Sequence, residues 1–270
     1  MTRRELITLL CCGISAWQMA AYAQQRTQVD QRVADLAHAG KIRIGVFPST
    51  QYSEDSKTGE PKGLAIDITR AIAARLGIAE VIPIKHIDPV AVVACVKAGE
   101  CDLGFISIEP DRATEVDFTP PYIRRDFTYL VPAGSLIHNA TDADRPGVRI
   151  AAVSKHASTA ALVRTLKQVK PIYAEDLDSA FDLLRTGNAD ALASVRELVL
   201  RFSAQLPGSR VLEDSYESGL VGIAVQKGHA ERLAYISDFL DEAKRSGRLR
   251  QLIDSAGLRG FEVVTPRVPN

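Results

Sequence analysis

The sequence predicts an α/β protein made of two lobes that are joined by two hinge strands. Three observations lead to this prediction. Strands and helices alternate from residue 41 to residue 108, the same alternation begins again at residue 148, and two apolar runs, 127–131 and 219–225, connect the two units. Alternation of this kind is typical of sheets whose strands are linked by helices. The length of 270 residues is enough for one large or two ordinary domains.

The first unit is predicted to contain three strands and two helices. Alternating apolar residues indicate the first strand, and an apolar residue at every fourth position from Leu64 indicates a helix that ends at Gly77. Asp88 and Pro89 are typical of the start of a second helix, which stops at Gly99. The last strand is apolar throughout, as in a sheet covered on both faces. The expected strands are 41–47, 80–84 and 103–108.

The second unit repeats this order on a smaller scale. Its expected strands are 148–153, 171–173 and 189–193, and its expected helices are 158–169 and 178–185. After the run 219–225, a long terminal helix is expected over 230–246. Two α/β units with two crossings between them describe a clamp that closes about a hinge, and open α/β sheets present their strand ends to a ligand in such a cleft.

Composition excludes several classes of protein. Hydrophobic residues make up 46% of the chain and charged residues 24%, which is typical of a globular protein. Because 33 Lys and Arg residues balance 33 Asp and Glu residues, no excess of cations exists to neutralise phosphates. We therefore expect no nucleic acid partner.

The segment Met1 to Ala23 is predicted to be a cleaved secretory signal peptide. Arg3 and Arg4 precede a short apolar stretch that ends in Ala21-Tyr22-Ala23, the small-x-small pattern of a cleavage site. The stretch is too short for a typical spanning helix, so a retained membrane anchor is the weaker alternative. Export by the general or the twin-arginine route stays open.

Two cysteines, Cys95 and Cys101, remain after the signal is removed. In an exported chain they are expected to form a disulfide, and two free buried thiols are the alternative. A CxxC redox centre is excluded by their spacing. We expect no metal, because the sequence has no zinc-ligand pattern near them and its five histidines show no metal-binding spacing.

Four segments, taken together, resemble family 3 of the bacterial extracellular solute-binding proteins, the periplasmic receptors of ABC importers for amino acids and related polar solutes. They occur in the order of that family and span about 40–257. The segments are KIRIGV (41–46), GLAIDITRAIAARLG (63–77), DRATEVDFTPPY (111–122) and LRTGNADA (184–191).

The resemblance implies the type II fold of periplasmic binding proteins, in which each lobe is a mixed sheet flanked by helices. It implies that both ends of the mature chain build lobe 1 and that lobe 2 is inserted between the hinge strands. The predicted boundaries are 1–23 for the signal peptide, 24–40 for an N-terminal lead-in, 41–128 plus 226–262 for lobe 1, 129–225 for lobe 2 with the hinge strands at both ends, and 263–270 for a C-terminal tail.

In lobe 1 the resemblance assigns Arg112 to the grip on a ligand carboxylate. A guanidinium matches two carboxylate oxygens and stays charged, although a surface ion pair with Glu109 or Glu115 is the alternative. Ser107 is a further expected contact. Glu109 departs from the family, which has threonine there, so this carboxylate must turn away, pair with Arg112 or meet a cationic group of the ligand.

In lobe 2 the resemblance places Ser158 and Thr159 at a helix start, where free NH groups receive an anion. His156, which replaces a glycine of the family, and Ser194 are further expected ligand contacts. The aspartate that usually receives an α-ammonium is missing from the segment around Ser194 and Arg196. Arg196 is a second possible anion contact or a solvated helix residue, and Tyr52 is an aromatic wall for the ligand or part of the loop packing.

The expected function is a periplasmic receptor that captures a small polar solute, one that carries a carboxylate, in the cleft between the lobes. It would deliver this solute to the inner-membrane permease of an ABC importer. The ligand need not be a standard α-amino acid. We expect a monomer with no cofactor and no catalytic activity. The alternative is a periplasmic enzyme on the same fold that resembles cyclohexadienyl dehydratase, although no carboxylate follows Ser158-Thr159, where those enzymes carry their acid.

Overall fold

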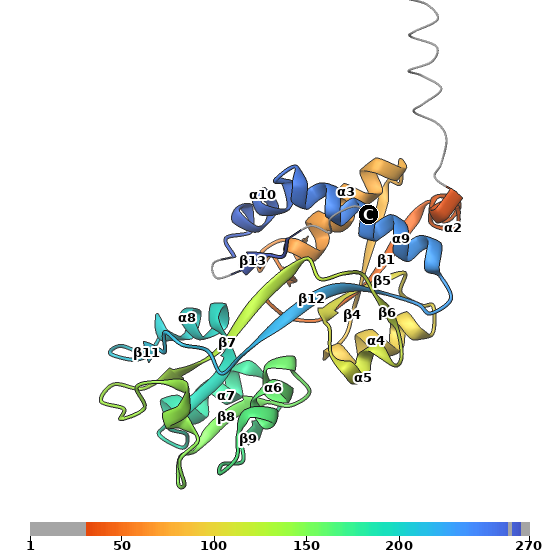
Figure 1. Ribbon diagram of the computed structural model, residues 1–270. Helices are drawn as coiled ribbons and strands as arrows, with labels where there is room; N and C mark the ends of the chain where they lie inside the picture. Colours follow the sequence, from red (N-terminus) through yellow and green to blue (C-terminus); the bar gives the residue numbers. More distant parts are fainter. Residues whose placement is uncertain (1–30, 259–260, 266–270) are drawn as a thin grey trace, which may run out of the picture.

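The computed structural model of the chain describes residues 31–258 and 261–265. It consists of two lobes, and two long strands, β7 (Ile123–Val131) and β12 (Glu217–Val225), run from one lobe to the other (Figure 1). This arrangement confirms the predicted fold class. The predicted signal segment 1–23 lies outside the described residues.

Lobe 1 is built from two separate parts of the chain. The first part comprises η1 (Gln31–Val33), α2 (Ala34–Ala39), β1 (Lys41–Val46), β2 (Ser53–Glu54), β3 (Pro61–Lys62), α3 (Leu64–Leu76), β4 (Glu80–Lys85), α4 (Pro89–Lys97), β5 (Leu103–Ser107), α5 (Pro110–Ala113) and β6 (Asp117–Phe118). The second part comprises α9 (Ala230–Arg245), α10 (Arg248–Ser255) and β13 (Phe261–Val263). Two of its helices have the predicted ends: Asp88 caps α4, and Gly77, with φ 70°, closes α3.

Lobe 2 is one continuous stretch. Its elements are η2 (Ala140–Ala143), β8 (Ile150–Val153), α6 (Ala157–Thr165), β9 (Ile172–Ala174), α7 (Leu177–Arg185), β10 (Ala191–Val195), α8 (Arg196–Ser203) and β11 (Arg210–Val211). The predicted helix 158–169 ends early, at Thr165. The carboxylate of Asp144 accepts hydrogen bonds from the backbone NH groups of Lys167, Gln168 and Val169, at 2.8, 2.8 and 3.1 Å, and these bonds hold the following segment out of the helix.

A single mixed sheet passes through both lobes. The strand order is β4-β1-β5-β12-β7-β10-β8-β9, and β6, β11 and β13 pair with the hinge strands beside this path. The strands β4, β1 and β5 are parallel, as are β10, β8 and β9, whereas β12 and β7 are antiparallel to their neighbours. The sheet thus continues from one lobe to the other without a break in its pairing.

The crossing between the lobes lies where β7 and β12 pair with each other, over 123–127 and 217–221. Beyond it, β12 joins β5 in lobe 1 and β7 joins β10 in lobe 2. This pairing overlaps the apolar runs 127–131 and 219–225 at Phe127 and over 219–221, and the rest of each run pairs with strands inside a lobe. At the crossing, Gly219 lets the ring of Phe127 approach closely, since a Cβ there would lie 2.3 Å from its Cζ atom.

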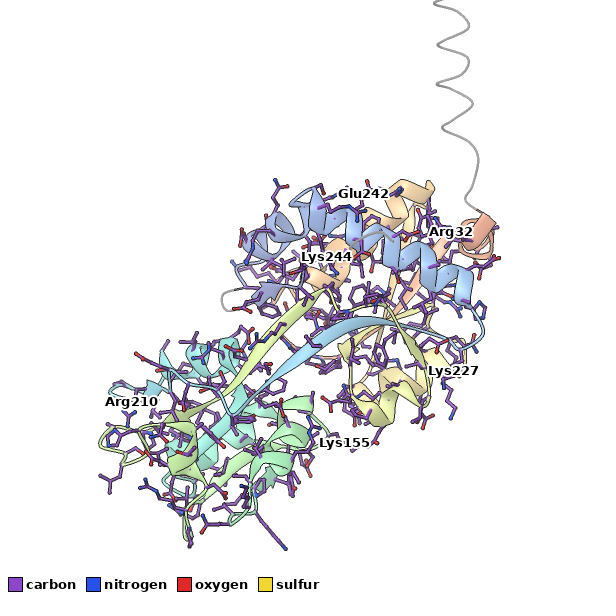
Figure 2. The ribbon with its side chains drawn as sticks, viewed as in Figure 1. Arg32, Lys155, Arg210, Lys227, Glu242 and Lys244 are labelled. Atoms are coloured by element: carbon purple, nitrogen blue, oxygen red, sulfur yellow. A yellow bond between two sulfur atoms is a disulfide. The ribbon has the colours of Figure 1, made fainter. Side chains whose placement is uncertain are left out.

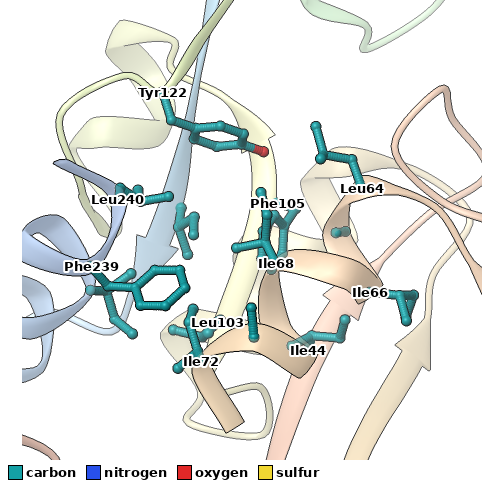
Figure 3. Packing of buried hydrophobic residues seen from close by; sticks show 14 of the residues in the cluster. Ile44, Leu64, Ile66, Ile68, Ile72, Leu103, Phe105, Tyr122, Phe239 and Leu240 are labelled. Carbon is teal, nitrogen blue, oxygen red and sulfur yellow. The ribbon is translucent and has the colours of Figure 1, made fainter. Parts of the chain in front are cut away.

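Helices cover both faces of the sheet in lobe 1. On one face α3, α9 and α10 pack against β1, β5 and β12, with Ile44, Leu103 and Phe105 fully or almost fully buried (Figure 3). On the other face α4 packs closely, and Gly104 makes this possible, because a Cβ there would lie 2.9 Å from Val96 Cγ2. Among the described residues, no helix is long and apolar enough to cross a membrane.

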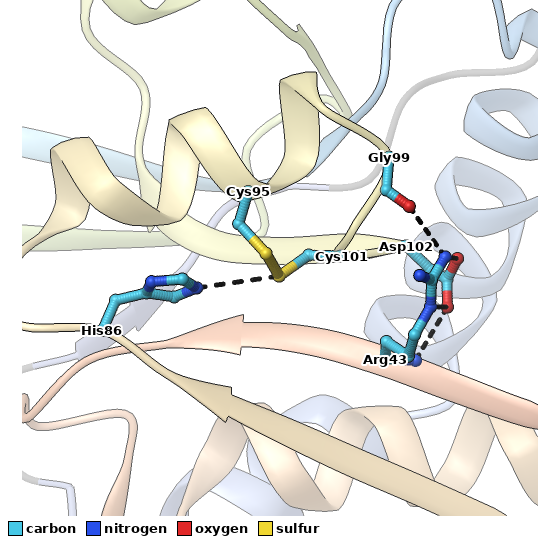
Figure 4. Close-up of a disulfide and its surroundings, with 6 residues drawn as sticks. All are labelled: Arg43, His86, Cys95, Gly99, Cys101 and Asp102. Carbon is cyan, nitrogen blue, oxygen red and sulfur yellow. Dashed lines mark hydrogen bonds and ion pairs between the residues drawn. A yellow bond between two sulfur atoms is a disulfide. The ribbon is translucent and has the colours of Figure 1, made fainter.

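The predicted disulfide between Cys95 and Cys101 is confirmed, and it joins the end of α4 to the segment that leads into β5 (Figure 4). The alternative of two free thiols is wrong. Beside it, Arg43 and Asp102 form an ion pair at 2.7 Å, and the Nε2 atom of His86 lies 3.8 Å from Cys101 Sγ.

Candidate ligand-binding site

A cavity lies between the lobes. Lobe 1, the hinge and lobe 2 all contribute to its wall, so it is the predicted cleft. Lobe 1 and the hinge contribute Phe47, Pro48, Ser49, Thr50, Pro89, Ser107, Arg112 and Arg125, and lobe 2 contributes His156, Ala157, Ser158, Leu177, Ser194, Val195 and Leu198.

Five of the sequence-predicted site residues line this cavity: Ser107, Arg112, His156, Ser158 and Ser194. The other four, Tyr52, Glu109, Thr159 and Arg196, do not. The five come from separate elements: Ser107 ends β5, Arg112 lies in the short helix α5, the start of α6 carries His156 and Ser158, and Ser194 lies in β10.

Arg112 extends from lobe 1 toward lobe 2. Its Nη1 donates to the carbonyl oxygen of Ser107 at 3.0 Å, and its Nη2 donates to the carbonyl oxygen of Lys155 at 3.2 Å. Burial lowers the pKa of the guanidinium from its usual value, and the neighbouring positive charge of Arg125 acts in the same direction. Both of these hydrogen bonds go to neutral carbonyl oxygens.

Glu109 turns away from the cavity and pairs with the other lobe. Its carboxylate accepts a hydrogen bond from Arg164 Nη1 at 3.1 Å, and a second ion pair joins Lys155 Nζ to Asp88 Oδ2 at 2.9 Å. Lys155 lies on the edge of lobe 2 that faces α4 and α5 (Figure 2). We call these two contacts the closure pairs, because each has one partner in either lobe.

Arg125, on the hinge strand β7, is a cavity residue that the sequence reasoning missed. Its side chain lies within the wall, with Nη2 donating to Ser107 Oγ at 2.8 Å and Nη1 lying 3.4 Å from Thr50 Oγ1. The signal that could have revealed it is strand alternation: Ile123, Arg125 and Phe127 are buried while Arg124 between them is exposed. An arginine therefore occupies the inward face of the strand.

Two titratable groups lie near these arginines. Burial, together with the positive charges of Arg125 and Arg112, lowers the pKa of His156 to about 4, so its ring is neutral at neutral pH. Burial raises the pKa of Glu197 to about 7, and the charge of Arg125 only partly offsets this effect. Both carboxylate oxygens of Glu197, in the first turn of α8, are buried without a hydrogen-bond partner among the described residues.

The remaining predicted residues have structural contacts. The hydroxyl of Tyr52 donates to Glu54 at 3.0 Å, beside a neighbouring groove. The hydroxyl of Thr159 donates to the carbonyl oxygen of Val153 at 2.6 Å. Arg196 donates to the carbonyl oxygens of Leu212 and Glu213 at 2.9 and 2.8 Å, and so fixes the loop before β12.

Within the part of the chain that the structure describes, one group of side chains has metal-ligand spacing: His86, Cys95 and Cys101. The disulfide occupies both sulfur atoms. While this bond is intact, the group offers a single imidazole and does not form a metal site.

The fold and the polar cavity between its lobes define a two-lobed binding protein for a small solute. The chain belongs to the bacterial extracellular solute-binding proteins, family 3, whose family model matches residues 42–257. It is therefore a solute receptor of the kind that serves ABC importers, as the sequence analysis predicted.

Among curated proteins, the chain is similar to a glutamine-binding protein of Geobacillus stearothermophilus, with 27% identity over 70% of this chain and 73% of that protein. It is also similar to a probable histidine-binding protein of Neisseria gonorrhoeae, with 24% identity over 79% of this chain and 82% of that protein.

Solved structures show the same fold. A solute receptor for L-cysteine from Neisseria gonorrhoeae aligns with a TM-score of 0.74 and 24% identity, over 84% of this chain and 94% of that one. An ancestral amino acid-binding protein, a precursor of cyclohexadienyl dehydratase, aligns with a TM-score of 0.71 and 23% identity, over 83% of this chain and 97% of that one.

Proposed function

We propose that this chain is a periplasmic receptor that binds a small carboxylate-bearing solute in the cavity between its lobes, and that its closed form docks to an inner-membrane permease. The observation that carries the proposal is the set of hydrogen bonds made by Arg112. This partly buried side chain lines the cavity, and its hydrogen bonds with described residues go to two carbonyl oxygens rather than to a carboxylate. A ligand carboxylate would supply the missing anion.

The start of α6 supports the same assignment from the opposite lobe. Ala157 and Ser158, the first residues of this helix, line the cavity, and His156 caps it without a side-chain hydrogen bond. The first NH groups of a helix are unsatisfied and carry partial positive charge, which favours an anion. A carboxylate between Arg112 and α6 would thus contact both lobes and favour their closure.

The ligand is proposed to lack an α-ammonium group. The named relatives bind amino acids, which would favour such a ligand here. However, none of the described residues that line the cavity is acidic, and Val195 and Leu198 cover its wall near Ser194. An ammonium group placed there would lose its hydration without gaining a carboxylate partner.

We propose binding and not catalysis. The wall near Ser158 includes alanine and leucine residues, and burial together with the charges of Arg125 and Arg112 keeps the ring of His156 neutral. Secretion through a signal peptide cleaved after Ala23, and a monomeric state, belong to the same proposal.

A thermal-shift screen of the mature chain tests this function. The panel contains amino acids, monocarboxylates, dicarboxylates, polyamines, opines and aromatic acids, and a ligand at about 100 times its Kd should raise the midpoint by roughly 5 °C or more. Isothermal titration calorimetry then gives the affinity. Tryptophan fluorescence cannot replace it, because the one tryptophan of the chain, Trp17, lies in the predicted signal and is absent from the mature chain.

Arg112→Ala should abolish binding of the carboxylate ligand, whereas Arg185→Ala should leave it unchanged, since Arg185 pairs with Asp182 within α7. Unchanged affinity in Arg112→Ala would refute the assigned role. No shift with any solute at millimolar concentration, together with product formation from prephenate or arogenate, would support the dehydratase alternative instead.

A further inference from the structure

Arg125 is a buried cation without a close counter-ion. Only 9% of the residue is exposed, and no carboxylate among the described residues lies within 4.0 Å of its guanidinium in an ion pair. Its Nε is buried and has no hydrogen-bond partner there. A buried charge of this kind needs a partner, because its hydration is lost. The residue lines the cavity, so a ligand can supply that partner.

Both arginines of the cavity donate a hydrogen bond to Ser107, and their other Nη atoms contact different elements. Arg112 Nη1 contacts the Ser107 carbonyl oxygen at 3.0 Å, and Arg125 Nη2 contacts its hydroxyl oxygen at 2.8 Å. The second Nη of Arg112 reaches Lys155 in the turn before α6, whereas the second Nη of Arg125 reaches Thr50 in the loop after β1. The cavity therefore offers two cationic positions that face different elements.

The acidic groups nearest to these positions either pair with other cations or are weakened as counter-ions by burial. Glu109 and Asp88 belong to the closure pairs with Arg164 and Lys155. The charge of Glu197 acts on Arg125, but burial raises the pKa of Glu197 to about 7, which weakens this group as a counter-ion near neutral pH. Among the described residues that line the cavity, two are arginines and none carries a carboxylate.

We propose, building on the receptor function above, that the ligand carries two anionic groups, one bound by Arg112 and the other by Arg125, and no ammonium group. The chemical class is a short aliphatic dicarboxylate, with or without a hydroxyl or keto group. Leu177, Val195 and Leu198 face its methylene groups, and the hydroxyls of Ser158 and Ser194 are available to the carboxylates.

The decisive experiment compares each dicarboxylate with its own monoamide. The probes are malonate, succinate, glutarate and adipate, their monoamides, and glutamate, and calorimetry is performed on mature protein that has been unfolded and refolded to remove any bound solute. At least one dicarboxylate should bind about tenfold or more tightly than its monoamide, because the amide cannot form the charge-assisted pair with Arg125. Glutamate should bind more weakly than glutarate.

Arg125→Gln should remove this discrimination: dicarboxylate affinity falls to that of the monoamide, and monoamide affinity stays the same. Arg124→Gln is the matched control, because Arg124 is exposed on the opposite face of β7 and pairs with Asp126 and Glu262 at 3.7 and 3.8 Å. If Arg125→Gln fails to fold, Arg125→Lys takes its place. The comparison of dicarboxylates with their monoamides on the wild-type protein tests the proposal in any case, because it needs no variant.

The outcomes separate this proposal from the receptor function. Equal affinity for dicarboxylates and monoamides would overturn the proposal of a ligand with two anionic groups, and so would tighter binding of glutamate or of a neutral amino acid. If binding of that solute depends on Arg112, the proposed receptor function still stands. Binding of no member of the full panel overturns both.

Discussion

Glu197 is a carboxylic acid in an unfavourable, buried environment. Both of its carboxylate oxygens are buried without a hydrogen-bond partner, close to Arg125, Asp126 and Arg196. Burial disfavours the charged form of a carboxyl group and so raises the pKa of Glu197 to about 7 in the folded state, from 4.5. The folded protein then holds a proton that the unfolded chain releases at lower pH.

This difference predicts a pH-dependent stability. As pH rises from about 4.5 to about 7, the unfolded chain loses this proton first, so the free energy of unfolding falls, by on the order of 3 kcal/mol from this group. Glu197→Gln removes the effect. The variant should be more stable than the wild type at pH 8 and nearly equal to it at pH 4.5, as measured by urea unfolding. Glu231→Gln, at an exposed position, is the control.

A stability difference between Glu197→Gln and the wild type that is the same at both pH values would contradict this account. It would mean that the carboxylate is ionised in the folded state and that a contact, rather than a proton, sets its contribution.

At the scale of elements, α6 and the turn before it carry both closure pairs. Lys155 has a φ of 62°, the single positive value among the described non-glycine residues, and this backbone conformation precedes the start of α6. A left-handed lysine is uncommon and moderately strained. The conformation accompanies the contact of Lys155 Nζ with Asp88, which supports a role for this turn in holding the lobes together.

Removal of one closure pair should favour the open form. Arg164→Ala breaks the contact with Glu109, and because the arginine is 51% exposed we expect only about 0.5–1 kcal/mol, or a two- to fivefold weaker ligand affinity. Small-angle X-ray scattering of the ligand-free protein should show a larger radius of gyration. Arg185→Ala, which touches only its own helix, should change neither quantity, and an equal effect of both variants would exclude closure as the cause.

The disulfide should stabilise lobe 1 by closing the short loop between α4 and β5. For a separation of 6 residues the chain-entropy model gives about 2 kcal/mol. The double variant Cys95→Ala/Cys101→Ala should unfold at correspondingly lower urea. Reduction of the wild type with dithiothreitol should lower its stability to that of the variant, whereas the variant should not respond; a response of the variant would show that the reductant acts elsewhere.

Local signals predicted most of the elements. The apolar stripe that starts at Leu64 lies within α3, and the cap at Asp88 belongs to α4. Because each signal is local to its own helix, both helices begin and end close to their predicted positions. The end of α6 depends on Asp144, more than twenty residues away in the sequence, and no local pattern reports it. The short helices α8 and α10 were not expected, although the buried Leu198, Val199 and Phe202 of α8 follow helical spacing.

For the whole molecule, the sequence predicts the two lobes and a hinge on the two strands that join them. Apolar runs mark the buried parts of these strands, whereas the crossing also carries Arg124, Arg125 and Asp126 on β7. Because Arg125 stands among these charged residues, the predicted site does not include it. Arg112 and Ser107 could be expected from the family motif, but the pairing of Glu109 with Arg164 depends on how the lobes meet, which no motif encodes.

The split construction of lobe 1 also imposes an order on folding. Lobe 2 is one unbroken stretch, so it can fold as a unit as soon as its residues are available. The sheet of lobe 1 must wait, because β12 inserts between β5 and β7, and β13 pairs with β7 opposite Arg125 only after α9 and α10 have been made. During vectorial synthesis the N-terminal strands therefore stay incomplete until almost the whole chain has emerged.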